Sequence, residues 1–513
     1  MSISQTSRAD ITAKAETRRI FALVLLIVLS DYLLFGQNAG FNLFLFSGAV
    51  TTAVLVLSRK SQAFTRKLSL LSVSVLCSLP LLESATPLGI GICVCAIMAV
   101  ALICSGMMPS RWSRMHLVLL RFAIVLPLPL FESCRRQFLS PRHSSSVLAV
   151  GRGIGLWLMP LALASVFLAL FAMANPLIEQ TIRNIRFTLL LQFLDIRRVG
   201  FWLLVATGVW AMLRPRLVRR GSGLALAGLG KIGIDHPLLG HALMVRSLII
   251  FNALFAVQST LDVVYLWSGA DLPDGLSHAE YAHRGAYPLI ATALLAAAFV
   301  LMTMKRDGPG DRSPLIRGLV FVWIAQNILL CLSSLMRLDL YVEAYSLTEM
   351  RIAAGIWMGL VAVGLLLILL RIVLRHSNEW LVAVNIAALA SVLYVCAVLD
   401  LPSFIARFNV LHSREVSNEG VLLDLDNLAS LGPSSIPAID LYIARLMSTG
   451  PGYATGLRLR ARQIRQSLSD EFEARPDDWR GWTFRASRLE SYLQSEAAIA
   501  TWHENGDNGS RPF

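Results

Sequence analysis

Two short polar stretches between apolar segments carry the side chains best suited to bind a ligand or to move protons. They supply the residues of a candidate polar site: Glu280, Tyr281, His283, Arg284, Asp339, Tyr341 and Glu343. General acid–base chemistry and polar recognition both use carboxylates, imidazoles and phenols that converge on one place. Ordinary anchoring at a membrane surface uses the same residue types, and this second interpretation stays open.

The spacing of these groups does not indicate a metal centre or an enzyme. His278 and His283 are five residues apart, about 140° around a helix, so they do not form the i, i+4 pair of a zinc-binding helix. The chain has no phosphate-binding loop, no dinucleotide fingerprint and no nucleophile with a base at a recognisable spacing. Its seven cysteines include no Cys-x-x-Cys pair and are typical of apolar packing. We expect no metal and no cofactor.

A second group of polar residues lies inside long apolar segments, where charge is costly and is usually functional or paired. The candidate intramembrane residues are Asp31, Arg246, Asn252, Gln258 and Asp262. Gln258 is one helical turn before Asp262, whereas Arg246 points about 160° away and cannot pair with that carboxylate. The available partners on other helices are Asp31, Gln326, Asn327 and Asn385. These residues either hold the bundle together or line a solute path.

The elements that position both groups are membrane-spanning helices. The chain has 513 residues, of which 55% are hydrophobic and 15% charged, and a span needs roughly 20 mostly apolar residues. The sequence predicts an all-α polytopic transmembrane helix bundle over residues 20–401, after a cytoplasmic segment 1–19. The predicted spans, about eleven, are 20–35, 41–57, 68–82, 88–104, 153–174, 201–213, 238–267, 287–304, 318–336, 352–370 and 380–399.

Basic residues set the predicted orientation. The formal net charge is +13, and the excess lies in loops beside spans, as the positive-inside rule requires, so we expect contact with the lipid bilayer and no nucleic acid. The N-terminus is then cytoplasmic and the residues after the last span lie outside. Residues 115–132 have basic residues at both ends and are predicted to be interfacial or re-entrant. Residues 178–200 mix apolar residues with Arg and are predicted to lie on the membrane surface.

Residues 402–513 are predicted to form a small soluble helical tail. Expected helices cover about 420–431, a stretch from Ser434 or Ser435 to 447, 457–472, and a stretch capped by Asp477 or Asp478 that reaches 500. Trp479, Trp482 and Phe484 begin the last of these. Docking on lipid or on a partner stays open for them, and we expect them to pack in the core of the tail. The tail is also where we expect an envelope protein partner to bind.

The chain resembles a bacterial family of multi-spanning proteins, domain of unknown function family 4173, which is related to family 4153. The resemblance covers about residues 240–440 and is carried by Arg246–Asn252, Ala279–Gly285, Leu338–Tyr341, Leu347–Arg351, Ala406–Val410 and Leu423–Leu431. It implies an integral membrane location and no catalytic residue. Together with the distribution of basic residues, we expect a bacterial inner (plasma) membrane protein with a periplasmic tail. We therefore expect an envelope interaction or signalling-associated membrane protein. The alternative is a transporter or channel-like protein that uses the intramembrane Asp and Arg residues.

Overall fold

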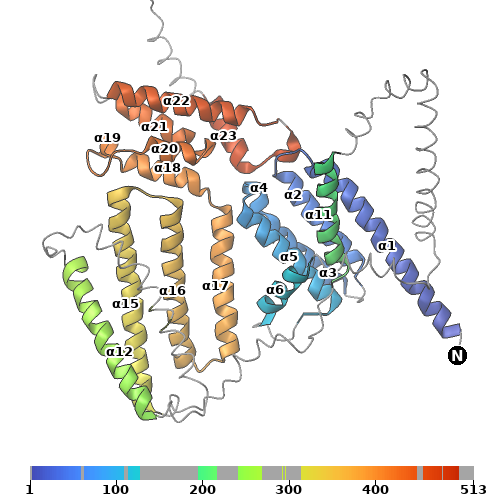
Figure 1. The fold of residues 1–513 in the computed structure, drawn as a ribbon, viewed down its shortest axis with the longest axis horizontal. Coiled ribbons are helices and arrows are strands. Elements are labelled where there is room, and N and C mark those ends of the chain that lie inside the picture. Colours follow the sequence, from blue (N-terminus) through green and yellow to red (C-terminus); the bar gives the residue numbers. More distant parts are fainter. Residues whose placement is uncertain are drawn as a thin grey trace, which may run out of the picture. The chain divides into compact units, whose positions relative to one another are not determined.

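The computed structural model describes residues 3–58, 63–108, 114–126, 195–215, 241–268, 292, 295, 313–447, 454–476 and 478–495. Every regular element within these ranges is a helix (Figure 1), which confirms the predicted all-α class. The contacts divide the chain into two units. Unit 1 comprises Met1–Leu79, Ile90–Ser110 and Arg114–Arg219, and unit 2 comprises Pro80–Gly89, Arg111–Ser113 and Arg220–Phe513.

Unit 1 is a group of apolar helices joined by small polar side chains. Its helices are α1 (Ile3–Leu34), α2 (Phe41–Val56), α3 (Phe64–Ser78), α5 (Pro87–Ser105, which enters this unit at Ile90), α6 (Met115–Val125) and α11 (Ile196–Leu213). Helix α1 packs against α2 and α11, and α2 packs against α3. Between α2 and α3 the hydroxyl oxygens of Thr51 and Ser74 are 2.9 Å apart, and Ser47 donates to Ser78 over 3.1 Å. Small hydroxyl residues let helices approach closely where no water competes for the hydrogen bonds.

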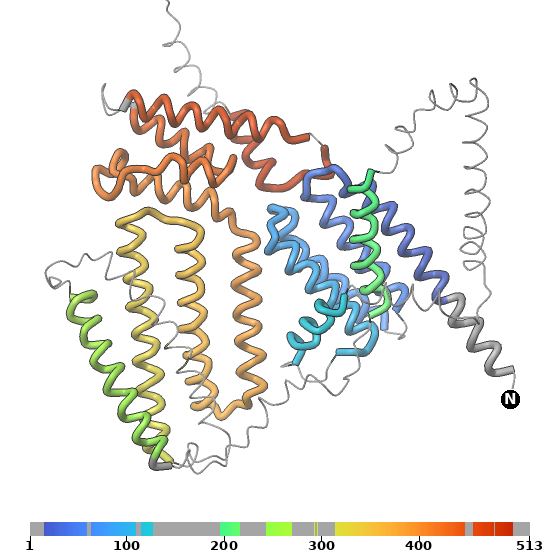
Figure 2. The backbone as a smooth tube through the Cα atoms, viewed as in Figure 1, coloured from blue at the N-terminus to red at the C-terminus, as the bar shows by residue number. Residues whose placement is uncertain are grey.

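Unit 2 contains four long helices that lie side by side (Figure 2). They are α12 (His241–Asp262, extended by the π-helix η4, Val263–Trp267), α15 (Pro314–Tyr345), α16 (Glu349–Val373) and α17 (Asn378–Val398). Leu248 of α12 packs with Ile316, Val320 and Ile324 of α15 in one buried apolar cluster. Helices α12 and α15 run in the same direction, because Asn252 bonds to Leu319 and Asp262 pairs with Arg337.

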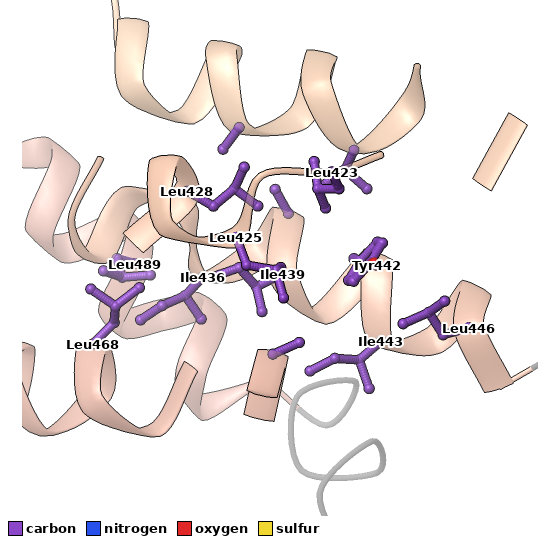
Figure 3. Close-up of a cluster of buried hydrophobic side chains, with 14 residues drawn as sticks. Leu423, Leu425, Leu428, Ile436, Ile439, Tyr442, Ile443, Leu446, Leu468 and Leu489 are labelled. Atoms are coloured by element: carbon purple, nitrogen blue, oxygen red, sulfur yellow. The ribbon is translucent and has the colours of Figure 1, made fainter. Parts of the chain in front are cut away.

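Unit 2 also holds the short helix α4 (Pro80–Glu83) and the tail. The tail elements are α18 (Leu401–Leu411), α19 (Arg414–Ser417), α20 (Leu425–Ser430), η5 (Pro433–Ser435), α21 (Ile436–Met447), α22 (Ala454–Glu473), η6 (Trp479–Gly481) and α23 (Phe484–Gln494). Figure 3 shows their buried core, in which Ile436, Ile439 and Tyr442 of α21 meet Leu428 of α20 and Leu468 of α22.

Seven described helices are long and apolar enough to cross a membrane: Phe64–Glu83, Pro87–Ser105, Ile196–Leu213, Leu243–Trp267, Pro314–Tyr345, Glu349–Val373 and Asn378–Val398. They fit a multi-pass integral membrane protein. The shorter apolar helices include α2 and α6. The predicted span 153–174, and 287–304 apart from residues 292 and 295, lie outside the described residues, so the total of about eleven stays a prediction.

The structure corrects three predicted boundaries. The stretch Arg337–Tyr345, expected to be a loop, is the last part of α15. The segment 178–200 is predicted to lie on the membrane surface and to be separate from the span 201–213. In its described part, Asp195 instead caps one helix that runs from Ile196 to Leu213. In the tail, Asp424 caps a shorter α20, and Thr483 rather than Asp478 caps the last helix. In the second and third cases a side-chain cap at the observed N-terminus defines the boundary.

The expected packing of the three tail aromatics in the core is also wrong. Trp479, Trp482 and Phe484 are 53%, 38% and 48% exposed. The rings of Trp482 and Phe484 make an edge contact with centroids 4.7 Å apart. Together these three residues form an exposed aromatic patch where η6 leads into α23.

Candidate functional site

The two charged residues most deeply placed in unit 2 form an ion pair between α12 and α15. The guanidinium of Arg337 bonds to the carboxylate of Asp262, and their side chains are 3% and 1% exposed. Gln258 Nε2 donates to Asp262 Oδ1 over 3.0 Å from one turn earlier, as its spacing predicted. A buried carboxylate is tolerated when an opposite charge and hydrogen bonds compensate for lost water. The pair therefore fixes the register of the two helices.

Further polar side chains continue along the same helix interface. Asn252 Nδ2 donates to the carbonyl of Leu319 over 3.1 Å, and Gln326 Nε2 reaches the carbonyl of Asn252 over 3.4 Å. Near the ion pair, Trp267 Nε1 donates to the hydroxyl of Ser333 over 3.2 Å. We call these residues, with Asp262 and Arg337, the α12/α15 polar seam. Hydrogen bonds between helices are a common source of cohesion in lipid.

The partners predicted for Asp262 are not the ones observed. Gln326 contributes to the seam elsewhere, while Asn327 and Asn385 bond to carbonyls one turn back in their own helices. Arg246 is exposed and does not pair with Asp262, as its position around the helix predicted. The sequence interpretation missed Arg337 because it ended the span at Met336. Arg337 directly follows an apolar segment, and Asp262 lies within another. One arginine and one aspartate placed in this way are the signal that could have predicted the pair.

Unit 1 contains a second ion pair, between α1 and α11. Arg198 Nε donates to Asp31 Oδ1 over 2.8 Å, and Trp202 Nε1 donates to the same oxygen over 2.9 Å. The guanidinium of Arg198 also lies over the ring of Phe35, 5.2 Å from its centroid. The carboxylate is mostly buried while Arg198 is about half exposed. Both acidic residues selected within the apolar segments are thus neutralised by an arginine on a neighbouring helix.

The candidate polar site is only partly described. Asp339 and Glu343 are exposed, one turn apart on α15. Tyr341, halfway between them, lies on the other side of the helix. Its ring lies 4.6 Å from the guanidinium carbon of Arg351, which bonds through Nη1 to the carbonyl of Tyr345 over 2.6 Å. The described half of the site therefore does not converge. Glu280, Tyr281, His283 and Arg284 lie outside the described residues.

The tail is joined to the long helices of unit 2 by buried polar contacts that the sequence did not reveal. Asn409 of α18 accepts a hydrogen bond from the amide of Leu347 over 2.7 Å and donates to the carbonyl of Leu347 over 2.9 Å. Leu347 lies between α15 and α16. Asp400, one residue after the α17 cap Leu399, caps α18 by accepting from the amide of Ser403 over 3.3 Å.

Two arginines of α23 form ion pairs with acidic residues at the end of α4 and just after α17. Arg488 Nη1 donates to Glu83 Oε2 over 3.1 Å. Arg485 lies 3.4 Å from Asp400 through Nε and donates to the carbonyl of Leu399 over 3.2 Å. The Glu83 carboxylate raises the pKa of Arg488 by stabilising its charged form. The last helix of the tail is therefore held both by a hydrogen bond to the backbone and by charge.

A buried charge cluster organises the tail itself. Arg465 Nε donates to Asp440 Oδ1 over 2.9 Å, and the hydroxyl of Tyr492 donates to Asp440 Oδ2 over 3.1 Å. Burial, and then the negative charge of Asp440, raise the pKa of Tyr492 well above its ordinary value. These groups come from α21, α22 and α23, so the cluster links three helices.

The described residues contain no group of three or more His, Cys, Asp or Glu side chains that could hold a metal ion. The described cysteines are free thiols, and they include buried Cys93, Cys104 and Cys331. The buried charged groups of the described ranges include two ion pairs that join helices, Asp262 with Arg337 and Asp440 with Arg465.

Comparison with known proteins identifies a family for this architecture. No curated protein and no solved structure matches the chain. The model of the family described as Domain of unknown function (DUF4153) matches residues 70–442, which is more than half of the chain and includes the α12/α15 polar seam and the contact of Asn409 with Leu347. The expected family 4173 is not shown, whereas its relative is. The protein is a multi-pass membrane protein that belongs to the DUF4153 family.

Proposed function

We propose that this protein is an envelope interaction protein of the bacterial inner membrane, and that a partner protein binds the exposed aromatic patch of its tail. The observation that carries the proposal is the exposure of Trp479, Trp482 and Phe484 on a helical tail with its own buried core. Exposed apolar patches mark interaction sites, and tryptophan and arginine dominate binding energy at protein interfaces. Arg480, paired with Asp478, supplies the charged edge of this patch.

The joints to the long helices support a signalling-associated role. Within unit 2 the tail contacts the ends of the long helices through Asn409, Asp400 and Arg485. A partner on the patch can therefore act on the membrane helices through these contacts. The distribution of basic residues in the loops supports a tail on the periplasmic side of the inner membrane. The parallel course of α12 and α15 supports one return crossing between them.

Site-specific photocrosslinking in intact cells tests the partner. A photoreactive residue replaces Trp479 or Trp482, and Leu459, which is 59% exposed on α22, serves as the control position. We expect one discrete protein adduct from positions 479 and 482 and none from 459. Adducts with lipid alone, or the same adducts from all three positions, would overturn the proposal. Paired reporters fused after Phe513 test the side of the tail, and a cytoplasmic signal contradicts the proposed orientation.

A solute path is the second candidate, and the α12/α15 polar seam is the observation that favours it. Within the described residues, Asn252 Oδ1, Gln326 Oε1 and the Ser259 hydroxyl are buried and form no hydrogen bond. Buried acceptors of this kind are costly in hydrocarbon and occur along ion and proton paths.

Proton flux into liposomes with a trapped pH dye tests this candidate. We expect wild-type protein to raise the flux over empty liposomes, and Asp262→Asn to reduce the flux per inserted protein. Asp339→Asn is the matched control, because it makes the same chemical change at an exposed position on the neighbouring helix α15. Equal flux with and without protein rejects the candidate.

A further inference from the structure

Three helix ends and the middle of α1 line a cavity of about 260 Å³ in unit 1. Its wall includes Arg19 of α1, Ser58 just after α2, Ser105 at the end of α5 and Arg214 just after α11. These residues are more than 35 positions apart in the sequence, yet they border one cavity. The positive-inside rule assigns the three helix ends, and Arg19 at the start of the first predicted span, to the cytoplasmic side.

The cavity is electropositive. Arg19 lines it although the residue is only 6% exposed, and Arg214 supplies a second guanidinium. Arg214 Nη1 bonds to Glu16 Oε1 over 2.7 Å and its guanidinium lies 6.0 Å from the centroid of the Trp210 ring. Guanidinium groups that line a cavity can hold an anion there by charge-assisted hydrogen bonds.

An acidic side chain offsets part of the positive charge at the cavity. Glu16 is paired with the lining residue Arg214, and it is half exposed. The two lining guanidiniums outnumber this carboxylate, so the cavity favours an anionic ligand over a cationic one.

The remaining wall is apolar. Val54, Ala101, Met212 and Leu213 line the cavity and are buried. The volume is just below the range of about 300–1,000 Å³ typical of small-molecule pockets, so the cavity suits a headgroup and not a whole lipid. A phosphate joined to an apolar chain matches a site with arginines at one side and aliphatic side chains at the other.

We propose that this cavity binds the phosphate headgroup of an anionic phospholipid in the cytoplasmic leaflet. Arg19 and Arg214 contact the phosphate, and the apolar wall contacts the start of an acyl chain. Basic pockets between membrane helices on the cytoplasmic side recognise such headgroups by this combination of charge and shape. The site is in unit 1, so it is independent of the partner proposed for the tail.

Lipid-dependent thermal stability of the purified full-length protein tests the proposal. The protein is placed in phosphatidylcholine nanodiscs, and the apparent Tm is followed as phosphatidylglycerol replaces phosphatidylcholine. A ligand that binds the folded state raises Tm with its concentration. We expect a phosphatidylglycerol-dependent rise for wild type, and about tenfold weaker binding for Arg19→Gln and for Arg214→Gln. Glu16→Gln is expected to strengthen binding, because it removes a competing negative charge.

Two further variants separate binding from folding. Arg197→Gln is the matched control, because Arg197 is 86% exposed on α11 and does not line the cavity; it is expected to keep the wild-type response. Ser105→Leu fills the cavity without a change of charge and is expected to abolish the response even if Arg19→Gln does not fold. An unchanged response in Ser105→Leu, or the same rise with inorganic phosphate alone, overturns the proposal.

Discussion

The side-chain amide of Asn409 forms two hydrogen bonds with the backbone of a single residue, Leu347. Its oxygen accepts from the amide of Leu347 and its nitrogen donates to the carbonyl of the same residue, while both residues are buried. These two bonds satisfy the backbone N–H and C=O of Leu347. That residue lies in the turn between α15 and α16, where helical hydrogen bonds do not supply the partners. An amide side chain is the one type that offers both a donor and an acceptor in this arrangement.

Asn409→Ala is expected to destabilise the protein by about 2–3 kcal/mol, since two buried backbone groups lose their partners. Asn409→Asp is expected to be at least as harmful, because a carboxylate has no donor for the Leu347 carbonyl. Thermal unfolding in detergent measures the effect. Asn378→Ala, at an exposed position at the start of α17, serves as the control, and an equal loss in both variants would contradict the assigned role.

The buried pair of Asp262 and Arg337 leads to a second prediction. Arg337→Met alone leaves the Asp262 carboxylate buried without its counter-charge and is expected to cost about 3–5 kcal/mol. The double variant Asp262→Leu with Arg337→Met removes both charges and is expected to recover most of this loss. Protein abundance and apparent Tm are the measurements, with Asp339→Asn as the exposed control on α15. A double variant that is worse than Arg337→Met would show that the charges do not act as a pair.

Tyr492 leads to a prediction about alkaline pH. Burial and Asp440 raise the pKa of its phenol in the folded tail, whereas in the unfolded chain the phenol ionises near pH 10. Above that pH the unfolded state loses the proton first, so stability falls as pH rises from about 10 toward the folded value. We expect Tyr492→Phe to reduce this alkaline loss and to cost about 1 kcal/mol at neutral pH, through the lost bond to Asp440. Thermal unfolding from about pH 7 to about pH 11, on either side of the ordinary phenol pKa, is the measurement. An identical alkaline slope in both proteins would rule out this assignment.

A pair of glycines in the tail gives a fourth prediction with opposite signs. Gly420 has φ +88°, and a Cβ there would lie 2.6 Å from the backbone oxygen of His412. Gly420→Ala is therefore expected to cost more than about 1 kcal/mol. Gly456 is exposed in helix α22, and a Cβ added there would meet no atom within 4 Å. Gly456→Ala is expected to stabilise by roughly 0.5–1 kcal/mol, and thermal unfolding distinguishes the two.

The sequence predicted the helices better than it predicted their polar partners. Long apolar runs identified α15, α16 and α17, since lipid requires each segment to satisfy its own backbone. The same pattern placed the end of α15 too early, because Arg337 resembles the basic residue that commonly follows a span. A charge at the end of an apolar run is either exposed to headgroups or buried against a partner. Only the packing of α12 on α15 separates these two cases.

The candidate sites were predicted only as individual residues. Gln258 and Asp262 were correctly placed on one face, because helical periodicity is local. Arg198 and Trp202, the partners of Asp31, are 167 and 171 residues away along the chain, and no periodicity relates them to it. The same is true of the exposed tail aromatics. Their apolar character predicts burial, but the sequence does not show whether another helix of the tail covers their rings.

The bond between Glu83 and Arg488 joins residues that are 405 positions apart. It cannot form until α23 has been synthesised, long after α4. A chain shortened before α23 would lack both arginines that contact Glu83, and its acidic side chain would keep neither of these partners.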